Sequence, residues 1–170
     1  MEAKVPLFFW LSILAIVVVA LVLTTEAPAQ AHTKYERAYT YASGSNCTWS
    51  RADKRHGSGG GYHYAFTRSK YSRWTPWGKM DCGQRWDRPP GNIAARYNNY
   101  KWNGKSWQVC TYTNYTYNPV TRHYHQVGVS SGSYPPCGRG YYGTTAFSYV
   151  KNGGQWYGGT IWSGYHWLPA

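Results

Sequence analysis

From residue 33 onward the chain alternates aromatic or β-branched residues with polar ones in short stretches, and no window repeats apolar residues at helical spacing. Alternation with a period of two is typical of a strand that has one buried face. The stretches cover residues 39–41, 62–66, 107–117, 122–129, 145–150 and 160–167. The pattern predicts an all-β fold, although residues 93–97 are also compatible with one turn of helix.

Two asparagine–glycine pairs mark turns between these stretches. Asn103-Gly104 and Asn152-Gly153 are strong signals for a β-hairpin, because both central residues of a type I′ turn need positive φ. Glycine- and proline-rich stretches at residues 57–61 and 132–136 predict further breaks between strands.

The two turns belong to a longer motif, Tyr-x-x-Asn-Gly-x-x-Trp, which occurs at residues 100–107 and again at 149–156. Three features precede each occurrence in the same order: Cys-Thr-aromatic, a His/Tyr alternation, and Cys-Gly. We interpret this order as an internal duplication with copies at residues 47–107 and 110–156, followed by a C-terminal strand at 157–170. The predicted fold is therefore a small, disulfide-stapled antiparallel β domain built from two duplicated halves.

The four cysteines predict two disulfides, because an even number in a small exported chain is typical of a disulfide framework. No Cys-x-x-Cys spacing occurs, which argues against a zinc site. Spacing alone permits three pairings. The duplication selects Cys47–Cys82 and Cys110–Cys137, since each copy should close its own ring.

The N-terminus reads as a secretory signal peptide. Lys4 precedes an apolar run at residues 5–23, and Ala29-Gln30-Ala31 has the small-x-small pattern of a cleavage site. We expect residues 1–31 to be removed and residues 32–170 to be secreted as a single β domain, without stable membrane insertion. The alternative is an uncleaved anchor at 5–23 that holds the domain outside the membrane.

Composition narrows the class of protein. The chain carries 18 Lys/Arg against six Asp/Glu, with 18 tyrosines and ten tryptophans, and Leu168 is the only leucine beyond residue 32. These numbers exclude a multi-pass membrane protein, a coiled coil, an ordinary helical domain and an acidic disordered tail. Nine of the basic residues lie between residues 51 and 88. They predict a basic face that attracts anionic polymers, or a charge that merely serves solubility.

The aromatic residues are too many to be buried with so little aliphatic filler. Trp107 and Trp156 occupy equivalent repeat positions, and we expect them to be a core pair. Other aromatics should be partly exposed, where flat rings with polar edges suit sugar rings or bases. The candidate ligand-binding residues are Trp74, Trp77, Arg73 and Lys79 in a basic loop, and Trp162, Tyr165 and Trp167 near the C-terminus.

The leading hypothesis is a secreted protein that binds a cell-surface or cell-wall polysaccharide, or another anionic surface polymer. Aromatic platforms would supply contact and Lys/Arg would supply attraction, so affinity should survive high salt. Nucleic acid would be bound only non-specifically. The hypothesis requires no cofactor and no metal, and it makes the chain a binding protein rather than an enzyme.

Catalytic signals are sparse, since no Gly-x-Ser-x-Gly occurs and the carboxylates lack a recognisable context. His63, His123 and His125 could form a three-histidine metal site or an acid–base pair, although partly exposed strand residues are the commoner explanation. The alternative function is therefore a secreted antibacterial toxin or ribonuclease that uses these histidines. A third alternative is an adhesive, tyrosine-rich surface protein without a discrete site.

Overall fold

A computed structural model describes residues 33–57, 60–71, 73–74, 76, 80–131 and 136–168. The chain divides into Met1–Ala31 and His32–Ala170, and all that follows concerns the second unit. The predicted signal peptide and anchor lie outside the described residues. Within the described residues, no helix is long and apolar enough to cross a membrane.

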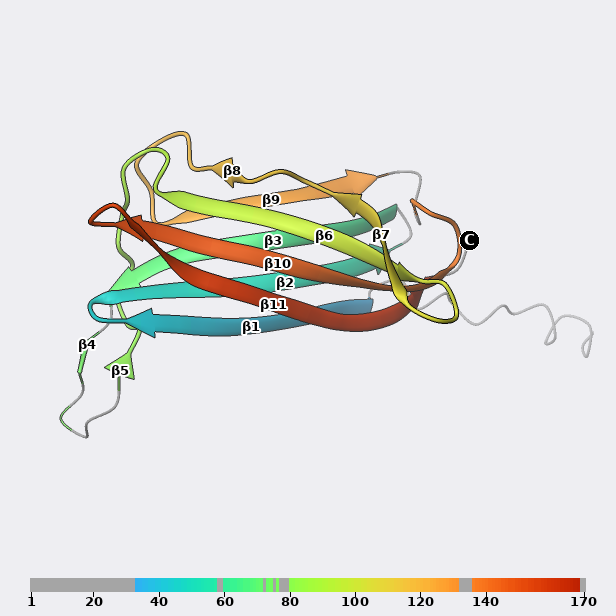
Figure 1. Cartoon of the computed structure of the whole chain (residues 1–170), viewed down its shortest axis with the longest axis horizontal. Coiled ribbons are helices and arrows are strands. Elements are labelled where there is room, and N and C mark those ends of the chain that lie inside the picture. The colour runs from blue at the N-terminus through green and yellow to red at the C-terminus, as the bar shows by residue number, and fades with distance from the viewer. Residues whose placement is uncertain are drawn as a thin grey trace, which may run out of the picture. The chain divides into compact units, whose positions relative to one another are not determined.

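The described chain forms two antiparallel sheets and a short ribbon (Figure 1). In the first sheet the order is β1 (Thr33–Ser43), β2 (Asn46–Gly57), β3 (Gly60–Tyr71) and β9 (Tyr124–Ser131). In the second it is β11 (Gln155–Leu168), β10 (Gly140–Asn152), β6 (Ile93–Trp102) and β7 (Trp107–Tyr112), with β8 (Thr116–Tyr117) also paired to β6. The ribbon pairs β4 (Arg73–Trp74) with β5 (Met80–Asp81). The all-β, antiparallel fold class is thus confirmed.

The two sheets lie face to face, with β10 and β6 over β2 and β3 (Figure 1). Small residues fill the space between them, namely Ala52, Ala65, Ala95 and Ala146 around Tyr97. Small side chains leave room for polar contacts across the interface. The Ser50 hydroxyl donates to that of Ser148 at 2.8 Å, which bonds the sheets directly. The narrow, polar interior needs few leucines or isoleucines.

This interior explains which strands the hydrophobic pattern missed. β2 turns Thr48, Ser50, Ala52 and Lys54 inward, and three of these four residues are polar, so the strand carries little apolar signal. β6 covers residues 93–97, which are a strand and not a helical turn. The predicted stretch at 107–117 divides into β7 and β8.

Both asparagine–glycine motifs form hairpins, but neither uses a type I′ turn at those two residues. In the β6–β7 hairpin the Asn103 side chain accepts from the backbone N–H groups of Lys105 and Ser106 at 2.9 and 2.8 Å. In the β10–β11 hairpin the turn is Gly153-Gly154, with φ of +54° and +83°, one residue beyond the predicted pair. Glycine adopts positive φ without steric cost, so a Gly-Gly pair also suits the two central positions of a type I′ turn.

The predicted disulfides Cys47–Cys82 and Cys110–Cys137 are both present. In the chain-entropy model each contributes roughly 3–4 kcal/mol for a closed loop of this length. The duplication that suggested the pairing stays a prediction.

Besides the disulfides, the Arg88 side chain connects the two sheets, at the end of the domain where the β1–β2 and β10–β11 turns lie. Its side chain is buried and donates three hydrogen bonds of 2.9 Å, to Ser69, Asn152 and Asn46. Its guanidinium also lies 3.3 Å from the ring centroid of Trp86. One side chain therefore ties the first sheet to the turn of the second.

Candidate functional site: an aromatic sheet face

The outer face of the second sheet is lined with aromatic rings. Along β10, Tyr142, Ala146 and Val150 are buried while Tyr141 and Tyr149 lie on the opposite side of the strand. The neighbouring strands add further rings at outward positions. The aromatic residues of this face are Tyr100, Trp102, Trp107, Tyr112, Tyr115, Tyr117, Tyr141, Phe147, Tyr149, Trp156, Trp162, Tyr165 and Trp167.

A β-bulge places three predicted residues on this one face. Trp162 and Tyr165 are three positions apart, so a regular strand would point them in opposite directions. In β11 the register shifts between Thr145↔Trp162 and Gly143↔Tyr165, which inserts an extra residue. Gly164 takes the positive φ of +86° that the bulge requires. Trp162, Tyr165 and Trp167 therefore share the outer face.

The first of two hollows, the tryptophan hollow, is lined by Trp102, Trp107, Tyr141 and Tyr165, with a volume of about 430 Å³. Its rings brace one another, since Trp107 lies 5.4 Å from Trp102 and 5.9 Å from Tyr165 between centroids. Tyr165 is 61% exposed, so the hollow opens to solvent.

Trp162 supports the tryptophan hollow from the side. Its indole lies 5.2 Å from Trp107 and packs over Gly143, where a Cβ atom would fall 2.1 Å from the indole carbon. Only glycine permits this approach, so the small residue in β10 fixes the position of the large one in β11.

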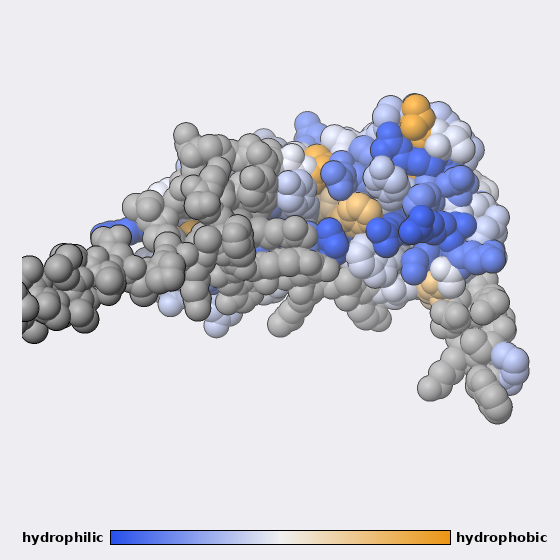
Figure 2. Space-filling model, turned by 180° about the vertical axis from the view of Figure 1, so that it is seen from behind, coloured by the Kyte–Doolittle hydropathy of each residue, from blue (hydrophilic) through white to orange (hydrophobic). Residues whose placement is uncertain are grey.

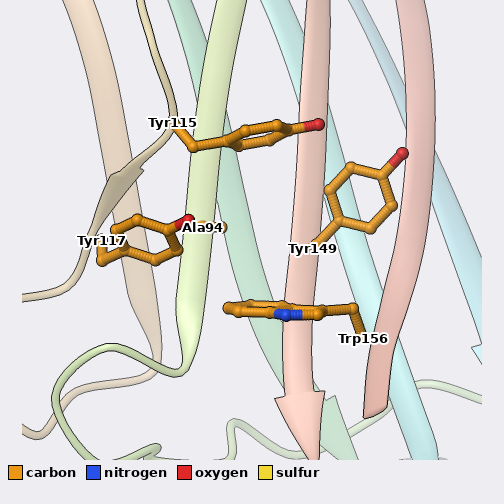
Figure 3. A pocket seen from close by; sticks show the side chains of 5 residues that line it. All are labelled: Ala94, Tyr115, Tyr117, Tyr149 and Trp156. Atoms are coloured by element: carbon orange, nitrogen blue, oxygen red, sulfur yellow. The ribbon is translucent and has the colours of Figure 1, made fainter.

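The second hollow, the tyrosine hollow, is lined by Tyr115, Tyr117, Tyr149 and Trp156 over Ala94, with a volume of about 230 Å³. Figure 3 shows Tyr115 and Trp156 on opposite sides of it, with Tyr117 and Tyr149 flanking them. Burial, followed by the neighbouring Tyr149, raises the pKa of Tyr115. The phenol therefore stays protonated at neutral pH and retains an O–H donor.

The two hollows lie at opposite ends of the face because their hairpins do. β6 and β10 are adjacent and antiparallel, so the hairpin after β6 and the hairpin after β10 lie at opposite ends of the sheet. Trp107 lines the tryptophan hollow, and Trp156 lines the tyrosine hollow. The prediction that Trp107 and Trp156 form a core pair is wrong: both lie on the outer face, and Trp156 is 41% exposed.

The opposite face, on the first sheet, combines aromatics with arginines. The guanidinium carbons of Arg51 and Arg68 lie 5.0–5.3 Å from the Phe66 ring centroid, and both also lie over Trp49. Arg51 also forms an ion pair with the buried Asp53 at 3.0 Å. The described part of this face is largely hydrophilic (Figure 2). On this face Trp49 and Phe66 are each covered by two arginines, whereas Tyr115, Phe147 and Trp156 of the second sheet each have one cation over them in the described part of the chain.

The three candidate histidines are not gathered into one site. His63 lies between the sheets with its Nε2 3.3 Å from the Thr111 hydroxyl, and His125 meets the Thr116 hydroxyl at 2.9 Å. His63 pairs with Val129 and His125 with Thr67, four ladder positions apart, or roughly 13 Å. His123 instead contacts Asp87 at 3.2 Å. Within the described residues no three metal-ligating side chains come together.

Two interior titratable groups, His63 and Lys54, have pKa values that favour their neutral forms at neutral pH. Burial, and secondarily the charge of Lys54, lowers the pKa of His63 to about 4. Burial also lowers the pKa of Lys54 to about 6, while its amine donates to the side-chain oxygen Oδ1 of Asn99 at 2.8 Å. These groups lie inside the fold, away from both hollows, and they bear on stability.

Of the predicted binding residues, Trp162, Tyr165 and Trp167 lie on the aromatic face. Trp77 and Lys79 lie outside the described residues, and for Arg73 and Trp74 only the backbone of β4 is described. The sequence argument did not single out the other lining residues, which are Trp102, Tyr115, Tyr117, Tyr141 and Tyr149. Their outward alternation with buried residues of β6 and β10 could have identified some of them.

Comparison with known families, curated proteins and solved structures finds no match for this chain, so the functional argument rests on its geometry.

Proposed function

We propose that this protein binds a polysaccharide through the outer face of its second sheet. The observation that carries the proposal is the pair of open hollows, both lined by aromatic rings on one sheet. The apolar faces of sugar rings stack on aromatic rings, while sugar hydroxyls pair with the phenol O–H and indole N–H groups at the ring edges. The strands hold these rings in place before a ligand arrives, which limits the entropy cost of binding.

The spacing of the hollows favours a polymer over a single sugar. Ala94 beneath one hollow and Tyr100 beside the other are six residues apart on β6, roughly 20 Å at ~3.3 Å per residue. An extended glycan spans this distance over several sugar rings. The two disulfides are compatible with a compartment outside the cell. Cell-surface or cell-wall polysaccharide is accordingly the proposed ligand class.

The test is co-sedimentation of the oxidised protein with insoluble wall polysaccharides at low salt and at about 1 M salt, where screening reaches ~3 Å. We expect retention at both. Trp107→Ala and Trp156→Ala should each weaken binding about tenfold, the equivalent of ~1.4 kcal/mol. Tyr124→Ala is the matched control, because Tyr124 lies on the opposite sheet and is 36% exposed, close to the 41% of Trp156.

The proposal is overturned if no polysaccharide is retained, or if the double variant Trp107→Ala/Trp156→Ala binds as the parent does. A further outcome would also overturn the proposal: the protein retains single-stranded RNA as well as it retains polysaccharide, and this RNA binding disappears at high salt. That result would show that charge drives the binding. Near-ultraviolet circular dichroism establishes that each variant is folded.

A further inference from the structure

Two cations flank the tyrosine hollow. On β6, the guanidinium carbon of Arg96 lies 4.1 Å from the Phe147 ring centroid and 5.1 Å from that of Tyr115. On β10, the Lys151 amine lies 5.8 Å from the Trp156 centroid. Because Tyr115 and Trp156 line the hollow from opposite sides (Figure 3), positive charge is present at both sides of it.

Neither cation is neutralised by a described residue. The structure gives Arg96 and Lys151 no hydrogen bond or ion pair from their side chains to the described residues, and the buried Nε of Arg96 has no acceptor. No aspartate or glutamate follows Asp87 in the chain, so the strands of the second sheet contain no carboxylate side chain. Two aromatic contacts position the guanidinium of Arg96, and its side chain has no hydrogen-bond or ion-pair partner among the described residues. This arrangement suits an anion whose oxygens can accept two hydrogen bonds side by side, such as a carboxylate or a sulfate.

The tryptophan hollow lacks this feature. In the described part of the chain, no Lys or Arg lies over the rings of Trp102, Trp107, Tyr141 or Tyr165, although cation–π contacts are common elsewhere in the domain. It offers rings and ring-edge donors only. The two ends of one face therefore present different chemistry to a bound chain.

We propose that the tyrosine hollow is the subsite for an acidic sugar, one that bears a carboxylate or sulfate group, and that the tryptophan hollow takes neutral sugars. This inference rests on the proposed polysaccharide binding and names its ligand class, a glycan that contains acidic residues. Stacking on Trp156 and the tyrosines holds the sugar ring. The Arg96 guanidinium pairs with its anionic group in a forked geometry, and Lys151 adds attraction from the other side.

The experiment compares a neutral glucan, polygalacturonate and a sulfated galactan as soluble ligands by isothermal titration calorimetry. Arg96→Gln should weaken binding of an acidic polymer about tenfold and change neutral glucan binding less than twofold. Arg96→Lys, which keeps the charge without the planar fork, should fall between the parent and Arg96→Gln. Lys105→Gln is the control, since Lys105 is an exposed cation on the β6–β7 loop. It should change none of the affinities more than twofold.

The ligands distinguish the two sources of the anion: loss for polygalacturonate alone assigns a carboxylate, and loss for the galactan alone assigns a sulfate. Equal weakening of neutral and acidic ligands by Arg96→Gln, or no weakening, overturns the inference while the proposed function stands. Absence of binding to all three ligands in the parent protein overturns both. A loss that Lys105→Gln reproduces would show general attraction and would also overturn the acidic subsite.

Discussion

The two hollows are built on the same eight-residue motif, yet they differ in size, lining and charge. Each hairpin delivers its final tryptophan, Trp107 or Trp156, to the outer face. Neighbouring strands supply the other rings, and only the tyrosine hollow has Arg96 and Lys151 beside it. The motif thus determines where an aromatic ring is presented, whereas the adjacent strands determine what that ring can bind.

The hairpins also differ in how the rest of the fold holds them. In the tyrosine-hollow hairpin, the Asn152 side chain accepts a hydrogen bond from the buried Arg88. In the tryptophan-hollow hairpin, the Asn103 side chain bonds within its own loop and to no other described residue. Instead, the disulfide Cys110–Cys137 lies at that end, where the Lys101 amine and the Tyr142 side chain bond the backbone around Cys137. One hollow depends on a buried guanidinium and the other on a covalent bridge.

The largest effect should follow from Arg88→Ala, which removes two buried hydrogen bonds and one part-buried hydrogen bond and leaves Asn46, Ser69 and Asn152 without this donor. We expect the free energy of unfolding in urea to fall by about 3–5 kcal/mol. Amide exchange should accelerate at the β10–β11 turn and stay unchanged at the β6–β7 turn. Arg85→Ala, at an exposed position, should cost less than about 0.5 kcal/mol. Equal acceleration at both turns would contradict the assigned role of Arg88.

Removing one bridge at a time should give the next largest effect. Cys110→Ser/Cys137→Ser and Cys47→Ser/Cys82→Ser should each lower the free energy of unfolding by roughly 3.5 kcal/mol, because the two loops have similar lengths of 27 and 35 residues. Their effects on binding should differ. Only loss of Cys110–Cys137 should weaken neutral glucan binding in calorimetry, since that bridge lies beside the tryptophan hollow. Equal weakening by both pairs would show that the bridges act through global stability alone.

The sequence predicts those parts of the fold that depend on contacts between residues close together in the chain, and it fails where a residue's burial depends on a distant strand. Alternation identifies most strands, and repeat order identifies both disulfides. The hydrophobic pattern fails at β2, where the buried positions include Thr48, Ser50 and Lys54, because these polar side chains bond to partners in the other sheet.

In the candidate site too, local sequence features identify some residues, whereas contacts between strands determine where the residues lie. Trp162, Tyr165 and Trp167 cluster near the C-terminus, so composition alone draws attention to them. Sharing one face also requires the bulge at Gly164, which no alternation rule predicts. The error at Trp107 and Trp156 has a related cause. A motif shows that two residues are equivalent, but which side of the sheet they occupy is set by register with the adjacent strand.

The smallest effect concerns pH and the strands behind the hollows. His63 contacts Thr111 of β7, which carries Trp107, and His125 contacts Thr116 of β8, which carries Tyr117. Burial lowers the pKa of both histidines, that of His63 to about 4. Between pH 6.5 and about 4 the unfolded chain therefore binds a proton that folded His63 does not, so stability falls as pH falls. The expected slope from His63 is at most about 1.4 kcal/mol per pH unit.

Urea unfolding at several pH values tests this assignment through the variant His63→Gln. The variant should remove the His63 part of the slope below pH 6.5 and leave a smaller slope from His125. Stability above pH 6.5 should still rise with pH, because the pKa of Lys54 is lowered to about 6 from 10.5 and its unfolded form holds a proton over that interval. An unchanged slope below pH 6.5 would mean that His63 accepts its proton in the folded protein, and that β7 is not held by a neutral imidazole.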